Sequence, residues 1–447
     1  MLEKRIPIPV AEAVAGVMEY VYQGEIEKIS LIESYGRTLG EDIIADHDVP
    51  HFNRSPYDGF AIRAEDTKEA SSSNPIQFEV IGEIGAGFVF TEEVKAFQAV
   101  RIMTGAAIPT GCNAVVMLEL TEGFEENEKT YMKLKRSFAA GDNISFKGED
   151  VKQNSILVRR GTVINPGVAA LLATFGYCSV HVVKQPVIGI VTTGSELLEV
   201  HEQLKPGKIR NSNSYMIAAQ IERAGGVVQY YGQFADDLDT CYNTVKKAMK
   251  EVDILITTGG VSVGDYDYLP AIYERLQANV LFNKIAMRPG SVTTVANVLF
   301  NKIAMRPGSV TTVAEVEGKL LFGLSGNPSA CYVGCELFVR PVIRTFLHRQ
   351  DPHVFRAEAI LQKDFPKANP FTRFVRGKVE IVDGTLQATP VGLDKSSAIS
   401  SLAEANAFIV LPGGTRGFEA GITVSVLLLE SNAESEWPWE EPLRSYK

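Results

Sequence analysis

The chain has few of the residues that build disulfide frameworks or zinc sites. Its five cysteines are odd in number and scattered over 447 residues, which is typical of a protein kept in a reducing compartment. Its six histidines form no HExxH or similar cluster. Both observations argue against a secreted disulfide scaffold and against a zinc enzyme.

Positive charge and long apolar runs are also scarce. Lys and Arg number 44 against 54 Asp and Glu, a net charge of −10, so we expect neither a nucleic-acid partner nor an acidic membrane surface. The first residues, MLEKRIPIPVAEAV, lack the apolar core of a signal peptide. The most apolar span, 167–183, is interrupted by Gly176 and His181 and is too short to cross a membrane. We therefore expect a cytoplasmic protein.

What is present is an ordinary globular composition, 45% hydrophobic and 22% charged, over a length that suits about three or four domains. From residue 185 to 348, strands alternate with helices, which predicts a doubly wound parallel sheet. Residues 51–144 and 349–447 alternate apolar and polar positions like small β domains. The fold class is therefore α/β multidomain, with a central α/β domain and small, mostly-β domains toward both ends.

The central stretch is DILITTGGVSVGDYDYLP, residues 253–270. Its apolar run predicts a strand buried on both faces, and its glycine turn then opens a helix with two aspartates near the start. A glycine turn at a strand's carboxyl end binds anions through backbone N–H groups, and a cation between acids and phosphate would relieve their repulsion. A metal-assisted phosphate site is one interpretation. The other is an ordinary loop with helix-capping aspartates.

Acids follow two further strands of the same sheet. QPVIGIVTTGSELLEV predicts a strand, a glycine turn and a helix with Ser195 and Glu196 in its first turn. VVQYYGQ leads to Asp236 and Asp237 before another helix. First-turn acids are favoured by the helix dipole alone, but three at one sheet edge favour a metal site. The predicted phosphate loop consists of Thr193, Gly194, Ser195, Gly259, Gly260, Ser262 and Gly264.

Residues 278–295, ANVLFNKIAMRPGSVTTV, are repeated without a difference at 296–313. Solenoid repeats diverge and need at least three copies, so a tandem duplication or an error in the sequence are the interpretations. We expect one copy to occupy the single strand position and the other to form a loop. The sequence does not decide which copy is extra. Extrusion is cheapest before the strand, where a connection already exists, so we take the second copy as the working one.

A basic strand in the tail, FTRFVRGKVEI, carries Arg373, Arg376 and Lys378. It is either a solvated strand face or an anion-binding surface.

Together these segments resemble the MoeA family of molybdopterin molybdenumtransferases, which is similar to the gephyrin E domain. The resemblance spans nearly the whole chain in order. It rests on DVPHFNRSPYDGFA, VRIMTGAAIPTG, GEDV, TTGSEL, NSNSYM, TTGGVSVGDYDY, KIAMRPG, GLSGNPSA, Arg376-Gly377 and SSLAEAN.

The resemblance implies a homodimer in which each chain has four domains. These are a linker and dimerisation domain (1–50 and 145–184), a small β domain (51–144), a molybdopterin-binding domain (185–348) and a C-terminal β domain (349–447). The implied reaction inserts molybdate into the dithiolene of adenylylated molybdopterin, with Mg²⁺-dependent release of AMP. The implied partners are the pterin adenylyltransferase of the same pathway and molybdoenzyme maturation factors.

The resemblance also assigns residues to roles. Asp58, Thr104 and Asp150 would face the partner subunit's cleft as catalytic residues. Mg²⁺ and the pyrophosphate would be held by Glu196, Asp236 or Asp237, and Asp267. Molybdate and the pterin phosphate would be bound by Lys302 and Arg306, or equally Lys284 and Arg288, with Arg376 and Ser401.

Two other functions fit parts of the sequence. The 185–348 domain alone resembles single-domain pterin adenylyltransferases and nucleotide hydrolases. A gephyrin-like interaction scaffold is the third candidate. The flanking SPYDGFA and SSLAEAN segments, and the absence of a long disordered linker, favour the transferase.

Overall fold

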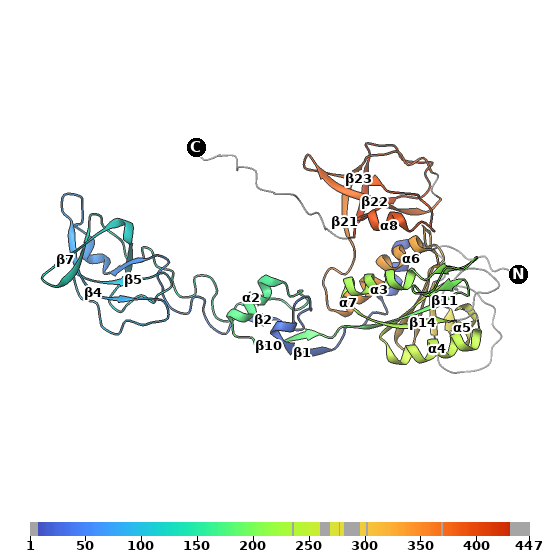
Figure 1. The fold of residues 1–447 in the computed structure, drawn as a ribbon, viewed down its shortest axis with the longest axis horizontal. Helices are drawn as coiled ribbons and strands as arrows, with labels where there is room; N and C mark the ends of the chain where they lie inside the picture. Colours follow the sequence, from blue (N-terminus) through green and yellow to red (C-terminus); the bar gives the residue numbers. More distant parts are fainter. Residues whose placement is uncertain are drawn as a thin grey trace.

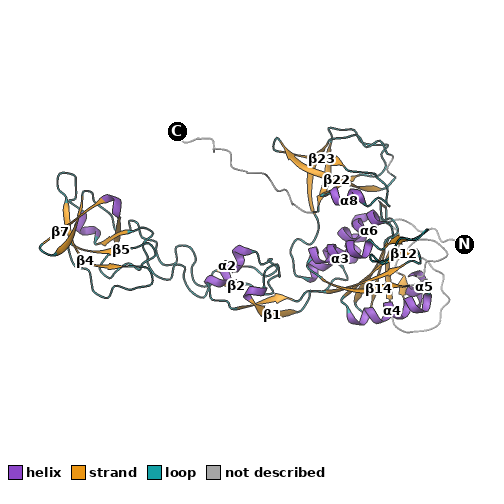
Figure 2. Cartoon of the chain, in the orientation of Figure 1, coloured by secondary structure: helices purple, strands orange, loops and turns teal. Residues whose placement is uncertain are grey.

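The computed structural model describes residues 8–234, 237–259, 269–276, 278–280, 296–300, 303–367 and 370–429. The chain forms four bodies along an elongated molecule, with a small β body at one end and an α/β body at the other (Figure 1). The fourth body, formed by the C-terminal part of the chain, lies beside the α/β body. Most helices belong to the α/β body (Figure 2). Within the described ranges, no helix has the length and apolarity needed to cross a bilayer.

The small β body is one six-stranded sheet whose side chains pack on both faces. Along one strand, Phe60 and Ile62 join one apolar cluster while Ala61 joins the other, as alternation along a strand requires. Residues 121–126 and 129–134 form an antiparallel hairpin. The strands, in sheet order, are β6 (Ala114–Met117), β3 (Gly59–Ile62), β5 (Gln98–Ile102), β4 (Ile76–Ile84), β8 (Lys129–Leu134) and β7 (Thr121–Glu126).

The second body connects the small β body to the α/β body, and two separate chain segments build it. Its apolar core contains Leu39, Ile164 and Val182. It consists of β1 (Ile26–Ser30) paired with β10 (Ser179–Val183), β2 (Ile43–Ile44) paired with β9 (Ile156–Val158), and α2 (Pro166–Thr174). Asn165 caps α2, because its side chain accepts a hydrogen bond from the Val168 backbone N–H.

The α/β body has a seven-stranded sheet with helices on both faces. Ile190 and Ile256 pack with α3 on one face, whereas Val191 and Leu255 pack with α4 on the other. In order the strands are β14 (Val227–Phe234), β11 (Val187–Thr193), β15 (Ile254–Thr258), β20 (Lys319–Leu324), β19 (Thr312–Val316), β17 (Ala296–Phe300) and β16 (Ala278–Val280). The helices are α1 (Val10–Met18), α3 (Asn213–Ala224), α4 (Leu238–Glu251), α5 (Leu269–Arg275), α6 (Pro328–Gly334) and α7 (Arg340–Phe346), with a π-helix at Cys335–Val339.

Two details of this body differ from the sequence prediction. The sheet is mixed: β14, β11, β15 and β20 run parallel to one another, whereas the short turn between β19 and β20 makes an antiparallel hairpin. The helix predicted at Ser195 is wrong: the chain turns there and forms β12 (Leu197–Leu198), which pairs with β13 (Ile209–Arg210). Pairing with a segment more distant in sequence outweighs the local helix pattern.

Both copies of the repeat enter this sheet. β17, from the second copy, pairs antiparallel with β19. β16, from the first copy, adds to β17 as a parallel edge strand, with Ala278 opposite Ala296 and Val280 opposite Val298. The prediction that only one copy contributes a strand is therefore wrong. The free edge of β17 offers backbone groups that a second strand can pair with.

The C-terminal body is a closed barrel with one short helix. β24 pairs with both β25 and β22, which closes the ring. β18 (Met305–Arg306) joins it from outside, parallel to β22, with Arg306 opposite Arg373. In order the barrel strands are β22 (Thr372–Val382), β23 (Thr385–Pro390), β21 (Phe355–Leu361), β25 (Thr423–Leu428) and β24 (Ala407–Leu411), and the helix is α8 (Ser400–Glu404).

Candidate functional site

The carboxyl ends of β11, β15 and β20 meet at one edge of the central sheet. Thr192 lies opposite Thr258, which lies opposite Leu324. The loop after β15 packs closely on the end of β11: a Cβ on Gly259 would lie 2.3 Å from the Thr193 carbonyl oxygen, at a φ of +84°. The structure thus brings together Thr193, Gly194, Ser195 and Gly259 of the predicted phosphate loop. The other members, Gly260, Ser262 and Gly264, lie outside the described residues.

Glu196 lies in an exposed turn directly after β11. Gly194 has a φ of +142°, and a Cβ there would lie 2.6 Å from a Glu196 carboxylate oxygen, so glycine leaves room for this carboxylate to fold back over the strand end. Carboxylate oxygens are ligands that Mg²⁺ accepts. The described residues contain no cluster of three or more metal-ligating side chains, and the other predicted ligands, Asp236 and Asp267, lie outside them.

Asp237 has a structural role that the sequence left open. Its carboxylate accepts a hydrogen bond of 2.8 Å from the Thr240 backbone N–H and caps α4. Hydrogen bonds from Thr240 lower the pKa of Asp237. Within this arrangement Asp237 acts as a helix cap.

A buried polar network beneath the sheet edge was not predicted. Asn213 donates from Nδ2 to the Thr258 hydroxyl (3.1 Å) and to the Gly326 carbonyl (3.0 Å). It therefore ties the end of β15 to the loop after β20. The sequence motif NSNSYM indicated only a helix start, because capping and bridging use the same polar residue types.

A pocket of about 490 Å³ lies between the loops of the α/β body and the C-terminal barrel. The parallel pairing of Arg306 with Arg373 forms one of its walls. Among the described residues, four cationic side chains line it, with one carboxylate, Asp394, which pairs with Arg373 at 3.3 Å. The lining residues are Arg306, Pro307, Gly308, Ser309, Val310, Ser325, Asn327, Ala330, Arg373, Arg376, Asp394, Lys395, Ser396 and Ser397.

Arg376 is a buried cation, only 2% exposed. Its Nε donates to the Ser401 hydroxyl at 2.7 Å, and its Nη2 donates to the Leu393 carbonyl at 2.6 Å. Burial lowers the pKa of Arg376, an effect that Asp394 opposes. Nη1 makes no hydrogen bond within the described part of the chain. Ser401 does not line the pocket; it holds the guanidinium that does.

The predicted basic strand face is only partly realised. Arg373 and Arg376 both line the pocket, whereas Lys378 is exposed and pairs with Glu380 at 2.5 Å. Of the cations predicted from the repeat, the pocket contains Arg306 from the second copy. Lys302, Lys284 and Arg288 lie outside the described residues.

The remaining predicted residues lie away from both features. Asp58 accepts hydrogen bonds from Thr104, 2.7 Å from the backbone N–H and 3.0 Å from the hydroxyl, and these lower the pKa of Asp58. Asp150 is exposed in the turn before Val151. Asp58 and Thr104 belong to the small β body, which lies at the opposite end of the chain from the central sheet (Figure 1). Within one chain the structure does not bring them to Glu196.

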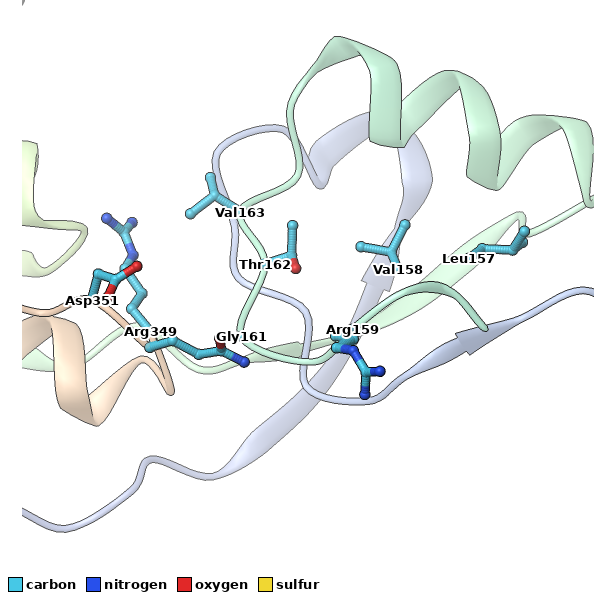
Figure 3. Close-up of a pocket in the computed structure, with 9 residues that line it drawn as sticks. Leu157, Val158, Arg159, Gly161, Thr162, Val163, Arg349 and Asp351 are labelled. Atoms are coloured by element: carbon cyan, nitrogen blue, oxygen red, sulfur yellow. The ribbon is translucent and has the colours of Figure 1, made fainter. Parts of the chain in front are cut away.

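A second pocket, of about 520 Å³, contains none of the predicted residues. Figure 3 shows the loop after β9 on one side, with Arg159, and the segment after α7 on the other, with Arg349 and Asp351. A Cβ on Gly161 would lie 2.4 Å from the His348 carbonyl oxygen, so the two bodies touch beside it. This pocket marks the junction between the second body and the α/β body.

Three family matches cover most of the chain. Residues 8–176 match the MoeA N-terminal region (domain I and II), residues 189–345 the probable molybdopterin binding domain, and residues 358–429 the MoeA C-terminal region (domain IV).

Proteins of known name are similar over the full length. The molybdopterin molybdenumtransferase of Bacillus subtilis is 61% identical over 447 residues, covering 100% of both chains. The enzyme of the same name from Staphylococcus epidermidis is 49% identical over 97% of this chain and 99% of its own. The crystal structure of the molybdopterin biosynthesis moeA protein from Pyrococcus horikoshii superposes with a TM-score of 0.78 at 32% identity, covering 95% of this chain and 100% of that one.

Proposed function

The chain belongs to the MoeA family of molybdopterin molybdenumtransferases, enzymes of molybdenum cofactor biosynthesis, and we propose that it inserts molybdate into adenylylated molybdopterin with Mg²⁺-dependent release of AMP. The pocket lined by Arg306, Arg373 and Arg376 carries this proposal. Molybdate is a small tetrahedral dianion, and guanidinium groups and hydroxyls suit such an anion.

We call the pocket lined by Arg306, Arg373 and Arg376 the anion pocket, and the end of β11 with Glu196 the acidic sheet edge. Their charges are complementary. Ser325 and Asn327 line the pocket directly after β20, so the pocket adjoins the edge where Thr193 and Gly259 lie. Glu196, with Asp236 and Asp267, would hold Mg²⁺ at that edge. Bound Mg²⁺ would neutralise the pyrophosphate and so favour departure of AMP. Dithiolene and molybdate would thus meet between the α/β body and the barrel.

The active enzyme is a homodimer in this proposal. Asp58 and Thr104 lie at the far end of the elongated chain, so they reach a cleft only in a second copy (Figure 1). We place the reaction in the cytoplasm, between the pterin adenylyltransferase of the pathway, which supplies the substrate, and the maturation factors that receive the product.

Turnover by the purified dimer tests the proposal. Adenylylated molybdopterin should release AMP only when Mg²⁺ and molybdate are both supplied, and the product should activate an apo-molybdoenzyme. AMP release that does not depend on molybdate, with no active product, would assign a nucleotide hydrolase instead. A folded dimer that shows no turnover would favour the alternative function, a gephyrin-like interaction scaffold.

A further inference from the structure

Several arginines gather around one buried carboxylate where α3, the π-helix and α7 meet. Glu336, on the π-helix, is 1% exposed. It pairs with Arg223 of α3 and, at 2.8 Å, with Arg340 of α7. Two more arginines follow along the chain, one on α7 and one just beyond it. We call Arg223, Arg340, Arg344 and Arg349 the arginine cluster.

The positive charge of the arginine cluster exceeds what the described residues neutralise. Neither Arg344 nor Arg349 forms an ion pair in the described part of the chain. Burial, together with the charges of Arg340 and Arg349, lowers the pKa of Arg344 to about 10. The Nε atoms of Arg340, Arg344 and Arg349 are buried without a hydrogen bond. Half-buried guanidinium groups in this state call for an anionic partner.

Leu429, the last described residue, lies at the arginine cluster. Arg340 donates from Nη1 to the carbonyl of Leu429, at 3.4 Å, and Leu429 is buried in the same apolar cluster as Val339 and Val342. Residues 430–441, ESNAESEWPWEE, follow immediately in the sequence and contain five glutamates and no basic residue. A segment tethered at its binding site acts at an effective concentration in the millimolar range.

We propose that residues 430–441 bind the arginine cluster through their glutamates. This contact would fasten the end of the C-terminal barrel to α7 of the α/β body. The anion pocket lies between the same two bodies, so the contact would limit their separation. The inference does not depend on the proposed reaction, because it concerns charge pairing within the chain.

The two tryptophans of the chain, Trp437 and Trp439, both lie in this segment and report on it directly. In the wild-type protein their emission should be shielded from acrylamide, a neutral quencher. Arg344→Gln removes a charge-assisted hydrogen bond, which should lower the ratio of bound to free segment about tenfold. Quenching should therefore rise, and 1 M NaCl should have the same effect on the wild type. Arg416→Gln, an equal loss of charge at an exposed site of the barrel, should change nothing.

A second variant tests the same contact from the side of the C-terminal segment, so that a folding defect caused by Arg344→Gln cannot explain the result. Glu434→Gln with Glu436→Gln changes only the segment and should raise quenching as Arg344→Gln does. Unchanged quenching in both variants and in high salt would overturn the proposal. Quenching that falls as protein concentration rises would overturn it in favour of binding to a second copy. Calorimetric binding of inorganic phosphate that is lost in Arg344→Gln, with tryptophan emission unchanged, would assign the cluster to a small anion instead.

Discussion

Arg376 of β22 and Ser401 of α8 are hydrogen-bonded to each other, with 2.7 Å between Nε and the hydroxyl oxygen. Both are almost fully buried. Ser401 therefore fixes the position of a guanidinium that lines the pocket. The two residues form one unit of the anion pocket rather than two independent ligands.

Removing either member of this unit should weaken molybdate binding more than catalysis. Arg376→Ala should raise the molybdate concentration for half-maximal insertion about tenfold or more, since a charge-assisted hydrogen bond contributes about 1.5–3 kcal/mol. Ser401→Ala should shift it in the same direction. AMP release at saturating molybdate should change less. Ser400→Ala, at an exposed neighbouring position, is the matched control. An unchanged molybdate dependence would leave both residues with a structural role only.

The metal site should depend on Asp267, which follows the glycine turn after β15 in the sequence. Asp267→Asn removes a negative charge with little change in volume. Losing a metal-bridging carboxylate typically costs several kcal/mol of transition-state stabilisation. We expect most AMP release to be lost while sedimentation still shows a dimer. Wild-type AMP release from the purified variant would rule out the assignment.

The pKa of Asp58 should rise when its hydroxyl donor is removed. The Thr104 backbone N–H is the larger cause of the lowered pKa and the Thr104 hydroxyl the second. Thr104→Val keeps the first and deletes the second, so the pKa should move part of the way toward about 3.9, the value in unfolded chains. Because the pKa of Asp58 is lower in the folded protein, its carboxylate stabilises the fold at pH values above the unfolded-state pKa. This stabilisation is lost as the pH falls through the folded-state pKa. Carboxyl ¹³C shifts measure the change, with Thr110→Val as control.

Glu336 should be important for stability because two arginines share its charge. Glu336→Gln keeps the shape of the side chain but leaves buried guanidinium groups without a counter-charge. Breaking a buried ion pair on one side typically costs about 3–5 kcal/mol. Urea denaturation should show this loss, and Glu358→Gln, on the exposed side of β21, should show almost none. Equal midpoints for the two variants would mean that solvent already screens the network.

The sequence could predict features that depend on strand direction and pattern. Thr193 and Gly259 meet because parallel strands place their carboxyl ends at one edge. The segment SELLEV favours a helix at Glu196, but Leu197 and Leu198 pair with Ile209–Arg210 instead. Arg376 is covered by α8 and by the loop after β23, through Ser401 and the carbonyls of Leu393 and Lys395. Such contacts between segments that are distant in sequence are not visible in local periodicity.

The repeat changes the edge of the central sheet rather than the anion pocket. β17 holds the inner position beside β19, and β16 pairs with it in register because the two copies are identical. Deleting residues 278–295 removes β16 and leaves a sequence identical to that with either copy excised. The loop-closure free energy differs by only about 1–2 kcal/mol when a connection is longer or shorter by 18 residues, so the deletion changes this contribution little. We therefore expect the deletion variant to keep the fold, with a urea midpoint close to that of the full chain, because β17 stays paired with β19.

Paired substitutions identify the copy that serves the pocket. Arg306 lines it and is paired in register with Arg373. Arg306→Ala and Lys302→Ala should therefore abolish molybdate insertion, while Arg288→Ala and Lys284→Ala should spare it. In the deletion variant, one arginine and one lysine remain from the repeat, and replacing either should be as harmful as in the full chain. The opposite pattern, with activity lost in Arg288→Ala and kept in Arg306→Ala, would assign the pocket to the first copy. An intact mass lower than calculated by one repeat unit would show that the cell makes a chain without the duplication.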